Sequence, residues 1–269
     1  MIVREDVINL RDQIAGYKRR LTMKAIVIAF LSTIVLSSAA SAAEIRVIGS
    51  PGFREAYTDL LPGFETSVGH HVTTIWGGVN EVAKRVADGE VADIVILPAA
   101  QIDGLIRQGK LAPETRVDVA KSGIGVAIRA GAPRIDAASS DGIRKALIAA
   151  KSIAYSSGPS GVHMADVIQK WGIAGQLKAK TKISPPDTPV GVMIARGDAD
   201  IGFQQVSELI RLKGIDYLGP LPGDINEITV FSAAVHRNAL APEAAKALVK
   251  YLSAPEAAPT IRKTGMDPG

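Results

Sequence analysis

The sequence predicts an α/β protein with two lobes, each a mainly parallel sheet flanked by helices, and two crossings of the chain between them. Short β-branched runs alternate with longer amphipathic runs, which is typical of strands and helices in parallel sheets. Two longer β-like stretches interrupt this alternation and are the expected crossings. A single doubly wound sheet is the alternative fold for a chain of this length.

Six short runs have the composition of buried strands. They are residues 44–48 (EIRVI), 72–76 (VTTIW), 93–97 (DIVIL), 152–155 (SIAY), 180–183 (KTKI) and 200–204 (DIGFQ). Helices bounded by Gly, Pro or capping residues are expected between them. These helices are 54–67, 80–88, 100–108, 139–150, 162–171, 189–196 and 207–213, and two more are expected near the C-terminus.

The crossings are predicted at residues 119–128 (VAKSGIGVAI) and 228–236 (ITVFSAAVH). Lobe one then comprises residues 43–121 and 232–269, and lobe two comprises residues 122–231. Small residues near both boundaries can absorb the backbone rotation of a hinge.

Residues 1–42 are predicted to be a leader and signal peptide that is removed. Met23 begins the segment MKAIVIAFLSTIVLSSAASA, in which an apolar run precedes an A-x-A pattern that ends at Ala42. A membrane anchor is the alternative, but the apolar run is shorter than the about 20 residues that a spanning helix needs. We expect cleavage after Ala42, export to the periplasm, and an over-extended start over residues 1–22.

Charge and composition argue against nucleic acid as a partner. The formal charge of the chain is +4, but the expected leader holds six basic and three acidic residues, which leaves 25 basic and 24 acidic residues. Beyond the expected leader the sequence has no basic run, and only 4% of all residues are aromatic, so neither a phosphate-tracking stripe nor a base-stacking platform is expected. Without cysteine and without metal-ligand spacing of its four histidines, the chain is expected to hold no metal and no cofactor. The lack of a lipobox cysteine excludes lipid tethering by that route, so a freely diffusing monomer is the default expectation.

Three loops of small residues lie between a predicted strand and a predicted helix. They are GSPGF (49–53), GGVN (77–80) and SSGPSG (156–161). In open α/β sheets ligands bind beyond the carboxyl ends of strands, where helix N-termini present N–H groups to an anion. A structural role is also open for each loop, because glycine permits a turn and Asn80 or Ser160 can cap a helix.

The three loops together favour a site for a small anionic ligand between the lobes. No phosphate-binding loop of the G-x-x-x-x-G-K-[ST] type and no G-x-G-x-x-G motif occurs. The candidate ligand-binding residues are Ser50, Gly52, Phe53, Arg54, Gly78, Val79, Asn80, Ser122, Ser157, Ser160, Gly161, Val162, His163, Gln204 and Gln205.

Two arginines follow the first loops. Arg54 could give a carboxylate ligand a bidentate guanidinium contact, whereas Arg85 belongs to the amphipathic run EVAKRVADGE and is expected on a solvated helix face.

Three segments carry a resemblance to a known family. GEVADIVILPAAQIDGLIRQGKL (89–111), GDADIGFQQVSEL (197–209) and AAKALVKYLSAPEAAPTIRKTG (244–265) resemble the periplasmic molybdate-binding proteins of ABC importers. The resemblance covers residues 45–265. It implies the two-lobed periplasmic binding protein fold with two hinge crossings, a small anionic ligand and an ABC permease of the inner membrane as partner.

The binding residues of that family carry over only in part. Ser50 matches a ligand-binding serine after the first strand, but the second loop has Gly78 and Val79 where the family has a hydroxyl. Gln204 and Gln205 stand near the position of a family tyrosine. The implied ligand is therefore a molybdate-like oxyanion or an organic carboxylate.

A second function is open on the same scaffold. Some proteins that resemble this family are periplasmic isomerases of unsaturated tricarboxylic acids such as aconitate. Proton transfer next to a carboxylate needs a general base, and the chain offers His163, Glu208 and Glu81 near the expected cleft. No Ser-His-Asp order and no catalytic cysteine is found, so no catalytic residue is assigned.

Overall fold

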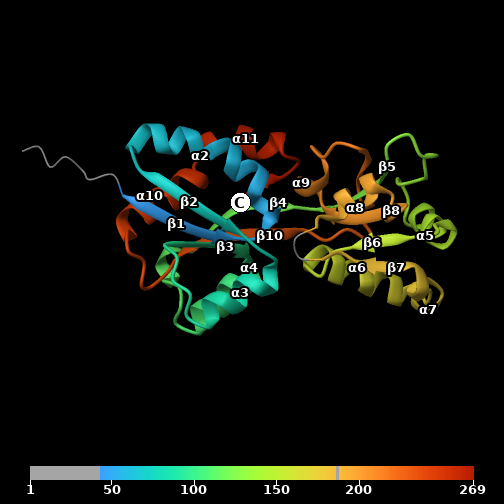
Figure 1. The fold of residues 1–269 in the computed structure, drawn as a ribbon, viewed down its shortest axis with the longest axis horizontal. Helices are drawn as coiled ribbons and strands as arrows, with labels where there is room; N and C mark the ends of the chain where they lie inside the picture. Colours follow the sequence, from blue (N-terminus) through green and yellow to red (C-terminus); the bar gives the residue numbers. More distant parts are fainter. Residues whose placement is uncertain (1–42, 186–187) are drawn as a thin grey trace, which may run out of the picture. The chain divides into compact units, whose positions relative to one another are not determined.

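Two β-sheets organise the computed structural model, which describes residues 43–185 and 188–269 (Figure 1). The expected leader and its cleavage site after Ala42 lie outside the described residues. No helix in the described part of the chain combines the length and the apolar character that a membrane span needs.

The first sheet has six strands in the order β11-β4-β10-β3-β1-β2. Its strands are β1 (Glu44–Gly49), β2 (His71–Trp76), β3 (Ile94–Pro98), β4 (Val117–Ser122), β10 (Thr229–Val235) and β11 (Asp267–Pro268). β1 pairs in parallel with β2 and β3, while β10 pairs antiparallel with β3 and β4. Because β10 is antiparallel to both β3 and β4, the strands β1 to β4 share one direction. β11 pairs antiparallel with β4.

The second sheet has five strands in the order β7-β6-β8-β5-β9. Its strands are β5 (Ile124–Arg129), β6 (Ile153–Tyr155), β7 (Thr181–Ile183), β8 (Ile201–Gln205) and β9 (Ile215–Pro220). β6 is parallel to β7 and β8, whereas β5 is antiparallel to both β8 and β9. The predicted α/β fold is confirmed. β5 and β10 each run antiparallel to both of their neighbouring strands, and each is the first strand after the chain crosses from the other sheet.

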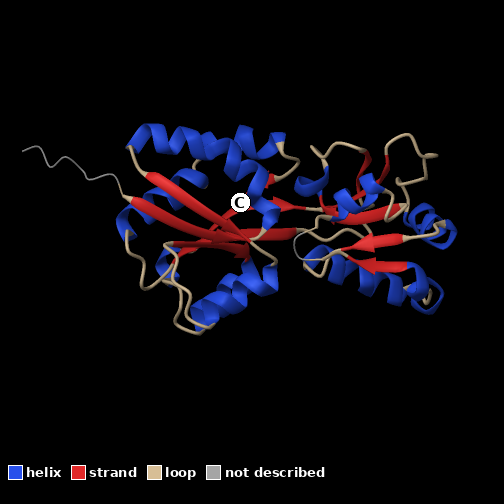
Figure 2. Ribbon diagram, in the orientation of Figure 1, coloured by secondary structure: helices blue, strands red, loops and turns tan. Residues whose placement is uncertain are grey.

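Helices cover both faces of each sheet (Figure 2). Those of the first sheet are α2 (Arg54–Val68), α10 (Pro242–Leu252) and α11 (Ala258–Lys263) on one face, with α3 (Val79–Ala87) and α4 (Ala99–Arg107) on the other. Those of the second are α5 (Ser140–Ala149), α6 (Pro159–Lys170) and α7 (Ala174–Leu177) on one face, with α8 (Val190–Arg196) and α9 (Val206–Leu209) on the other. Short 3₁₀ helices are η1 (Pro51–Phe53), η2 (Pro113–Thr115), η3 (Lys178–Lys180) and η4 (Pro255–Ala257).

Local sequence explains these elements. All five residues of β3 are buried, as expected for a central strand with helices on both faces. α5 begins where the Ser139 hydroxyl accepts a hydrogen bond from the Gly142 N–H at 3.0 Å. Ile143 and Leu147, four residues apart, form the buried face of α5. Removing such a pair of apolar side chains from water stabilises the packed helix by several kcal/mol, about 1.5–3 kcal/mol for each side chain.

The predicted crossing at 119–128 is two strands that belong to different sheets. β4 ends at Ser122 in the first sheet, and β5 begins at Ile124 in the second. The Ile124 N–H donates to Asn226 Oδ1 at 2.9 Å, which joins this crossing to the segment that leads back to the first sheet.

Two elements of the second sheet differ from the prediction. β9 was not predicted, and α6 begins three residues before Val162 because Pro159 fits the first helical position.

Side chains on β8, on α9 and just after α9 contact the elements of the first sheet. The Ser207 hydroxyl on α9 donates a buried hydrogen bond of 2.7 Å to the Gly52 carbonyl of η1. Arg211, just after α9, lies 2.8 Å from Asp59 on α2. The Gln205 amide links the two crossings. In the amide orientation that satisfies both of its polar atoms, the oxygen accepts a hydrogen bond from Thr229 Oγ1 at 2.9 Å and the nitrogen donates to the Ser122 carbonyl at 3.2 Å.

We predict that Gly161→Ala lowers the free energy of unfolding by at least about 2 kcal/mol, because a Cβ there overpacks the turn. An ideal Cβ at Gly161 lies 1.6 Å from the Ser156 carbonyl oxygen, which is backbone and cannot move alone. Gly175→Ala is the matched control, since nothing lies within 4 Å of its Cβ. The control is expected to be neutral or stabilising by about 0.5 kcal/mol. Urea unfolding of both variants measures the difference, and equal midpoints would contradict the prediction.

Candidate functional site

A cavity lies between the carboxyl ends of strands from both sheets. Its volume is about 600 Å³, including the part open to solvent. Elements of the first sheet contribute Ser50, Pro51, Gly52, Gly78, Val79 and Phe231. Elements of the second contribute Ser156, Ser157, Gly158, Pro159, Ser160, Ser184, Pro185, Thr188, Pro189, Gln204, Gln205 and Glu208. All three predicted small-residue loops reach this cavity.

The candidate residues from the sequence divide into three groups. Eight of them line the cavity, namely Ser50, Gly52, Gly78, Val79, Ser157, Ser160, Gln204 and Gln205. Asn80, Val162 and His163 line an adjoining cavity, which shares Val79, Ser157, Gly158 and Pro159 with the first. Phe53, Arg54, Ser122 and Gly161 line neither of these cavities. Ligand contact by any of the fifteen remains a prediction.

Two glycines among the candidates are explained by close packing. An ideal Cβ at Gly52 lies 2.1 Å from Cζ of the Phe231 ring, so only glycine lets η1 pass this side chain. Gly161 faces the Ser156 carbonyl in the same way. The loop SSGPSG therefore contains small residues partly so that its backbone can fold tightly at the start of α6.

Ser50 is the most informative residue of the site. It follows β1, and its N–H donates to the Ile96 carbonyl at 3.0 Å, which fixes its backbone in the sheet. The side chain is fully buried, and Oγ has no hydrogen-bond partner among the described residues. A buried hydroxyl without a partner costs about 1–3 kcal/mol. A ligand that accepts or donates a hydrogen bond at this position would remove that cost.

Helix N-termini add positive potential to the cavity. α3 starts at Val79 and α6 starts at Pro159, and both residues line the cavity. The N-terminus of a helix carries roughly half a positive charge together with unpaired N–H groups. The Ser156 hydroxyl accepts from the Gly158 N–H at 3.2 Å and lies 3.4 Å from the Ser160 hydroxyl. These neutral donors are suited to a small anion.

Arg54 lies beside the cavity and not in its wall. Its guanidinium group is 5.3 Å from the centre of the Trp76 ring, within the range of a cation–π contact. Tyr57 meets the same ring edge-on at 5.3 Å. Arg54 Nε is buried and has no hydrogen-bond partner among the described residues. Arg54 thus contributes a positive charge close to the site from a fixed position.

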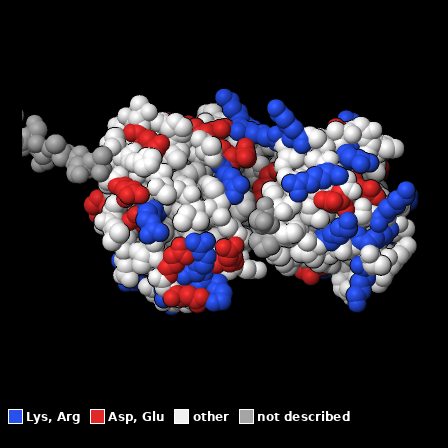
Figure 3. All heavy atoms as spheres, in the orientation of Figure 1, with Lys and Arg blue, Asp and Glu red and all other residues white. Residues whose placement is uncertain are grey.

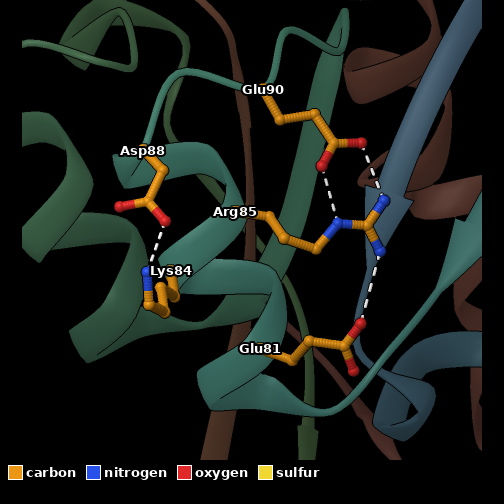
Figure 4. A network of polar contacts seen from close by, with 5 residues as sticks. All are labelled: Glu81, Lys84, Arg85, Asp88 and Glu90. Carbon is orange, nitrogen blue, oxygen red and sulfur yellow. Dashed lines mark hydrogen bonds and ion pairs between the residues drawn. The ribbon is translucent and has the colours of Figure 1, made fainter.

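Other charges are spread over the surface or paired with each other. Basic and acidic side chains are interspersed on the face shown in Figure 3. On α3, Arg85 binds Glu90 through two contacts of 2.6 and 2.8 Å and reaches Glu81 at 3.4 Å (Figure 4). The guanidinium of Arg85 holds the pKa of Glu90 below its usual range. Arg85 is therefore engaged by carboxylates near its own helix and does not line the cavity.

Glu208 is the candidate base that lines the cavity. Burial raises the pKa of its carboxyl to about 7, although nearby Arg54 and a hydrogen bond from Gln204 act in the opposite direction. The residue is half-buried and lines the cavity. A carboxyl with this pKa can give or accept a proton near neutral pH.

The two other candidate bases are occupied elsewhere. His163 lies 2.7 Å from a Glu227 carboxylate oxygen and 2.9 Å from the Ile225 carbonyl, so both ring nitrogens face acceptors. Glu81 is exposed on α3 beside Arg85. Within the described ranges, no cluster of three His, Cys, Asp or Glu side chains is placed to hold a metal ion.

Sequence reasoning missed one wall of the site. Ser184, Pro185, Thr188 and Pro189 line the cavity between β7 and α8. This connection contains no glycine, so it lacks the signal that identified the other three loops. Its position after the carboxyl end of a parallel strand was the remaining clue.

Comparison with known proteins agrees with this architecture. A family model described as bacterial extracellular solute-binding protein matches residues 45–267, and the chain belongs to that family. The sequence is 32% identical to an aconitate isomerase from a Pseudomonas species over 255 residues, which cover 93% of this chain and 97% of the relative. It is 24% identical to the molybdate-binding protein ModA of Azotobacter vinelandii, with 86% and 92% of the two chains covered.

The fold is also that of a solved binding protein. The structure of the Azotobacter vinelandii periplasmic molybdate-binding protein superimposes with a TM-score of 0.71 and 20% identity, covering 82% of this chain and 98% of that one. The expected resemblance to molybdate-binding proteins and the periplasmic binding protein fold are thus confirmed.

Two buried serines allow a matched test of the site. Ser207→Ala removes the hydroxyl that donates to the Gly52 carbonyl, and we predict a loss of about 1 kcal/mol or more in unfolding free energy. Ser50→Ala removes a hydroxyl that has no partner in the described part of the chain, and it is expected to leave the ligand-free protein equally or more stable. Thermal or urea unfolding without ligand measures both, and a larger loss for Ser50→Ala would contradict the assignment.

Proposed function

We propose that this solute-binding protein is a periplasmic receptor that captures a small organic carboxylate in the cavity and delivers it to an ABC permease. The observation that carries the proposal is the fully buried Ser50 hydroxyl, which lines the cavity without a partner among the described residues. Helices α3 and α6 begin at the same cavity and favour negative charge there.

The composition of the wall favours a carboxylate over a molybdate-like oxyanion. Gly78 occupies a position where the molybdate-binding family has a hydroxyl, so one expected oxyanion donor is absent. Glu208 in the wall can instead share a proton with a carboxylate of the ligand. The relative that is 32% identical is named for aconitate, a tricarboxylic acid, which supports the same ligand class.

A thermal-shift screen of purified protein tests the ligand class. Molybdate, tungstate, sulfate, citrate and cis-aconitate are compared at equal ionic strength. An anion at a hundred times its Kd adds about 2.7 kcal/mol to the unfolding free energy. We expect stabilisation by the organic acids. Stabilisation by molybdate and tungstate alone would show that the site takes a metal oxyanion.

Ser50→Ala and Ser160→Ala test the position of the site. Each removes a hydroxyl of the cavity wall, and a hydrogen bond to a charged group contributes about 1.5–3 kcal/mol, so Kd should rise at least about tenfold. Ser253→Ala, after α10, is the matched control and should leave Kd unchanged. Calorimetry with the best anion of the screen measures the effect. Unchanged affinity in both cavity variants would place the ligand elsewhere.

The second candidate function is a cofactor-independent isomerase of an unsaturated tricarboxylic acid. One observation favours it: Glu208 combines a place in the cavity wall with a pKa of about 7. Its carboxylate would take a proton from the methylene carbon next to the double bond of aconitate. The double bond then shifts, and the same carboxyl returns a proton to the other end of the three-carbon unit. The neutral donors of the cavity would stabilise the charge that develops on the substrate carboxylate.

Turnover of cis-aconitate separates the two candidates. Purified protein is incubated with cis-aconitate, and the ultraviolet absorbance and the product are followed. If the protein is an isomerase, Glu208→Gln should abolish turnover while it retains the binding of citrate. Binding without any turnover by the unaltered protein supports the receptor, and turnover that persists in Glu208→Gln would exclude Glu208 as the base.

A further inference from the structure

The carboxyl of Glu208 is the one ionisable group among the described residues that line the cavity. The other lining residues are Ser, Gly, Pro, Thr, Val, Phe and Gln. We propose that Glu208 enters the ligand complex as a carboxylic acid whose Oε2 hydroxyl donates to the bound anion, so that the cavity takes up one proton with its ligand. This inference rests on the proposed function, since it assumes that an organic anion binds in this cavity.

The position of the proton follows from a fixed chain of hydrogen bonds. The backbone N–H of Val190, at the start of α8, donates to Gln204 Oε1 at 2.9 Å. A backbone N–H can only donate, so it fixes which end of the Gln204 amide is the oxygen. Gln204 Nε2 therefore donates to Glu208 Oε1, at 2.7 Å. The carbonyl oxygen of a carboxylic acid is a better acceptor than its hydroxyl, so Oε1 takes the carbonyl role and the exchangeable proton of Glu208 is placed on Oε2.

The surrounding charges leave Glu208 without a direct cationic partner. α9 packs against β5, β8, β9 and η1. Arg54 follows η1 and favours the ionised carboxyl through its field, but no ion pair within 4 Å joins it to Glu208 among the described contacts. Arg211, one turn beyond Glu208, is held by Asp59 at 2.8 Å and lies 3.7 Å from Glu55.

The strands contribute few other titratable groups. On β9, Asp216 accepts from the Gly131 N–H at 3.1 Å, and burial raises the pKa of Tyr217, which keeps its phenol neutral. β5 carries Arg129 at its far end, beside Gly197, and β8 carries no ionisable residue. Among the described residues, Arg54 is thus the cation that acts on Glu208, and it does so without an ion pair to the carboxyl.

The direction of the pH effect follows from these contacts. The pKa of Glu208 is about 7 in the free protein, and a bound anion raises it further because two like charges repel. Below pH 7 the carboxyl is already protonated, so affinity is nearly constant. Above pH 7 binding must take up a proton, and affinity falls by up to about tenfold per pH unit. In the isomerase candidate kcat would instead rise with pH, because proton abstraction needs the ionised carboxyl.

Calorimetric titration with citrate and with cis-aconitate tests the proposal. Kd is measured from pH 6.5 to 9 at constant ionic strength, and each titration at pH 8 is repeated in two buffers with different ionisation enthalpies to count protons. The unaltered protein is expected to take up close to one proton and to lose about tenfold in affinity for each pH unit above 7.

Two variants complete the test. Glu208→Gln has an amide that can accept from Gln204 and donate to the ligand, so it should bind at pH 8 at least as tightly as the unaltered protein, with no proton uptake and a flat pH profile. Glu243→Gln changes an exposed carboxyl on α10 and should keep the profile of the unaltered protein.

Each outcome is informative. Binding of either acid without proton uptake and with a flat profile would overturn the proposal and leave the proposed receptor function intact. A pH-dependent profile that persists in Glu208→Gln would also overturn it, because another group would then take up the proton. Failure of both acids to bind at any pH would contradict the proposed function and this inference together.

Discussion

Strands β1, β2, β6, β7 and β8 of the two sheets end at one cavity, and this shared orientation positions the groups on which binding is expected to depend. It is maintained by buried contacts between the sheets, above all the hydrogen bond from Ser207 to the Gly52 carbonyl. That contact places α9, with Glu208, directly against η1, which follows Ser50. A hydroxyl from one sheet and a carboxyl from the other therefore line the same small space.

Neutral groups dominate this space. Serine hydroxyls and the first turns of α3 and α6 provide partial positive charge, while Arg54 acts from outside the wall. Binding an anion through dipoles instead of a full countercharge limits the cost of opening the site again. A receptor must release its ligand, so a site that binds an anion without a full countercharge suits this role. In the proposed complex, the protonation of Glu208 would adjust the one ionisable group among the described residues of the wall.

Two functions are proposed above for one scaffold. The fold fixes the cavity, but the ligand and any chemistry depend on a few side chains. The second small-residue loop brings Gly78 and no hydroxyl to the cavity, and Glu208 contributes a carboxyl with a pKa of about 7. The 32% identity to an aconitate isomerase spans 93% of the chain, so the second candidate function has a relative that matches over almost the whole length.

The sequence by itself determined the fold class, six strands to within one residue at each end, and the three loops that reach the cavity. These features depend on local periodicity and on turn residues, which act over a few positions. Only the tertiary structure decided that the predicted crossing at 119–128 is two separate strands, β4 and β5, and that Asn226 meets Ile124 across 102 positions of the chain. It also decided that Glu208, and not His163, lines the cavity with a raised pKa, since burial comes from distant segments packed together.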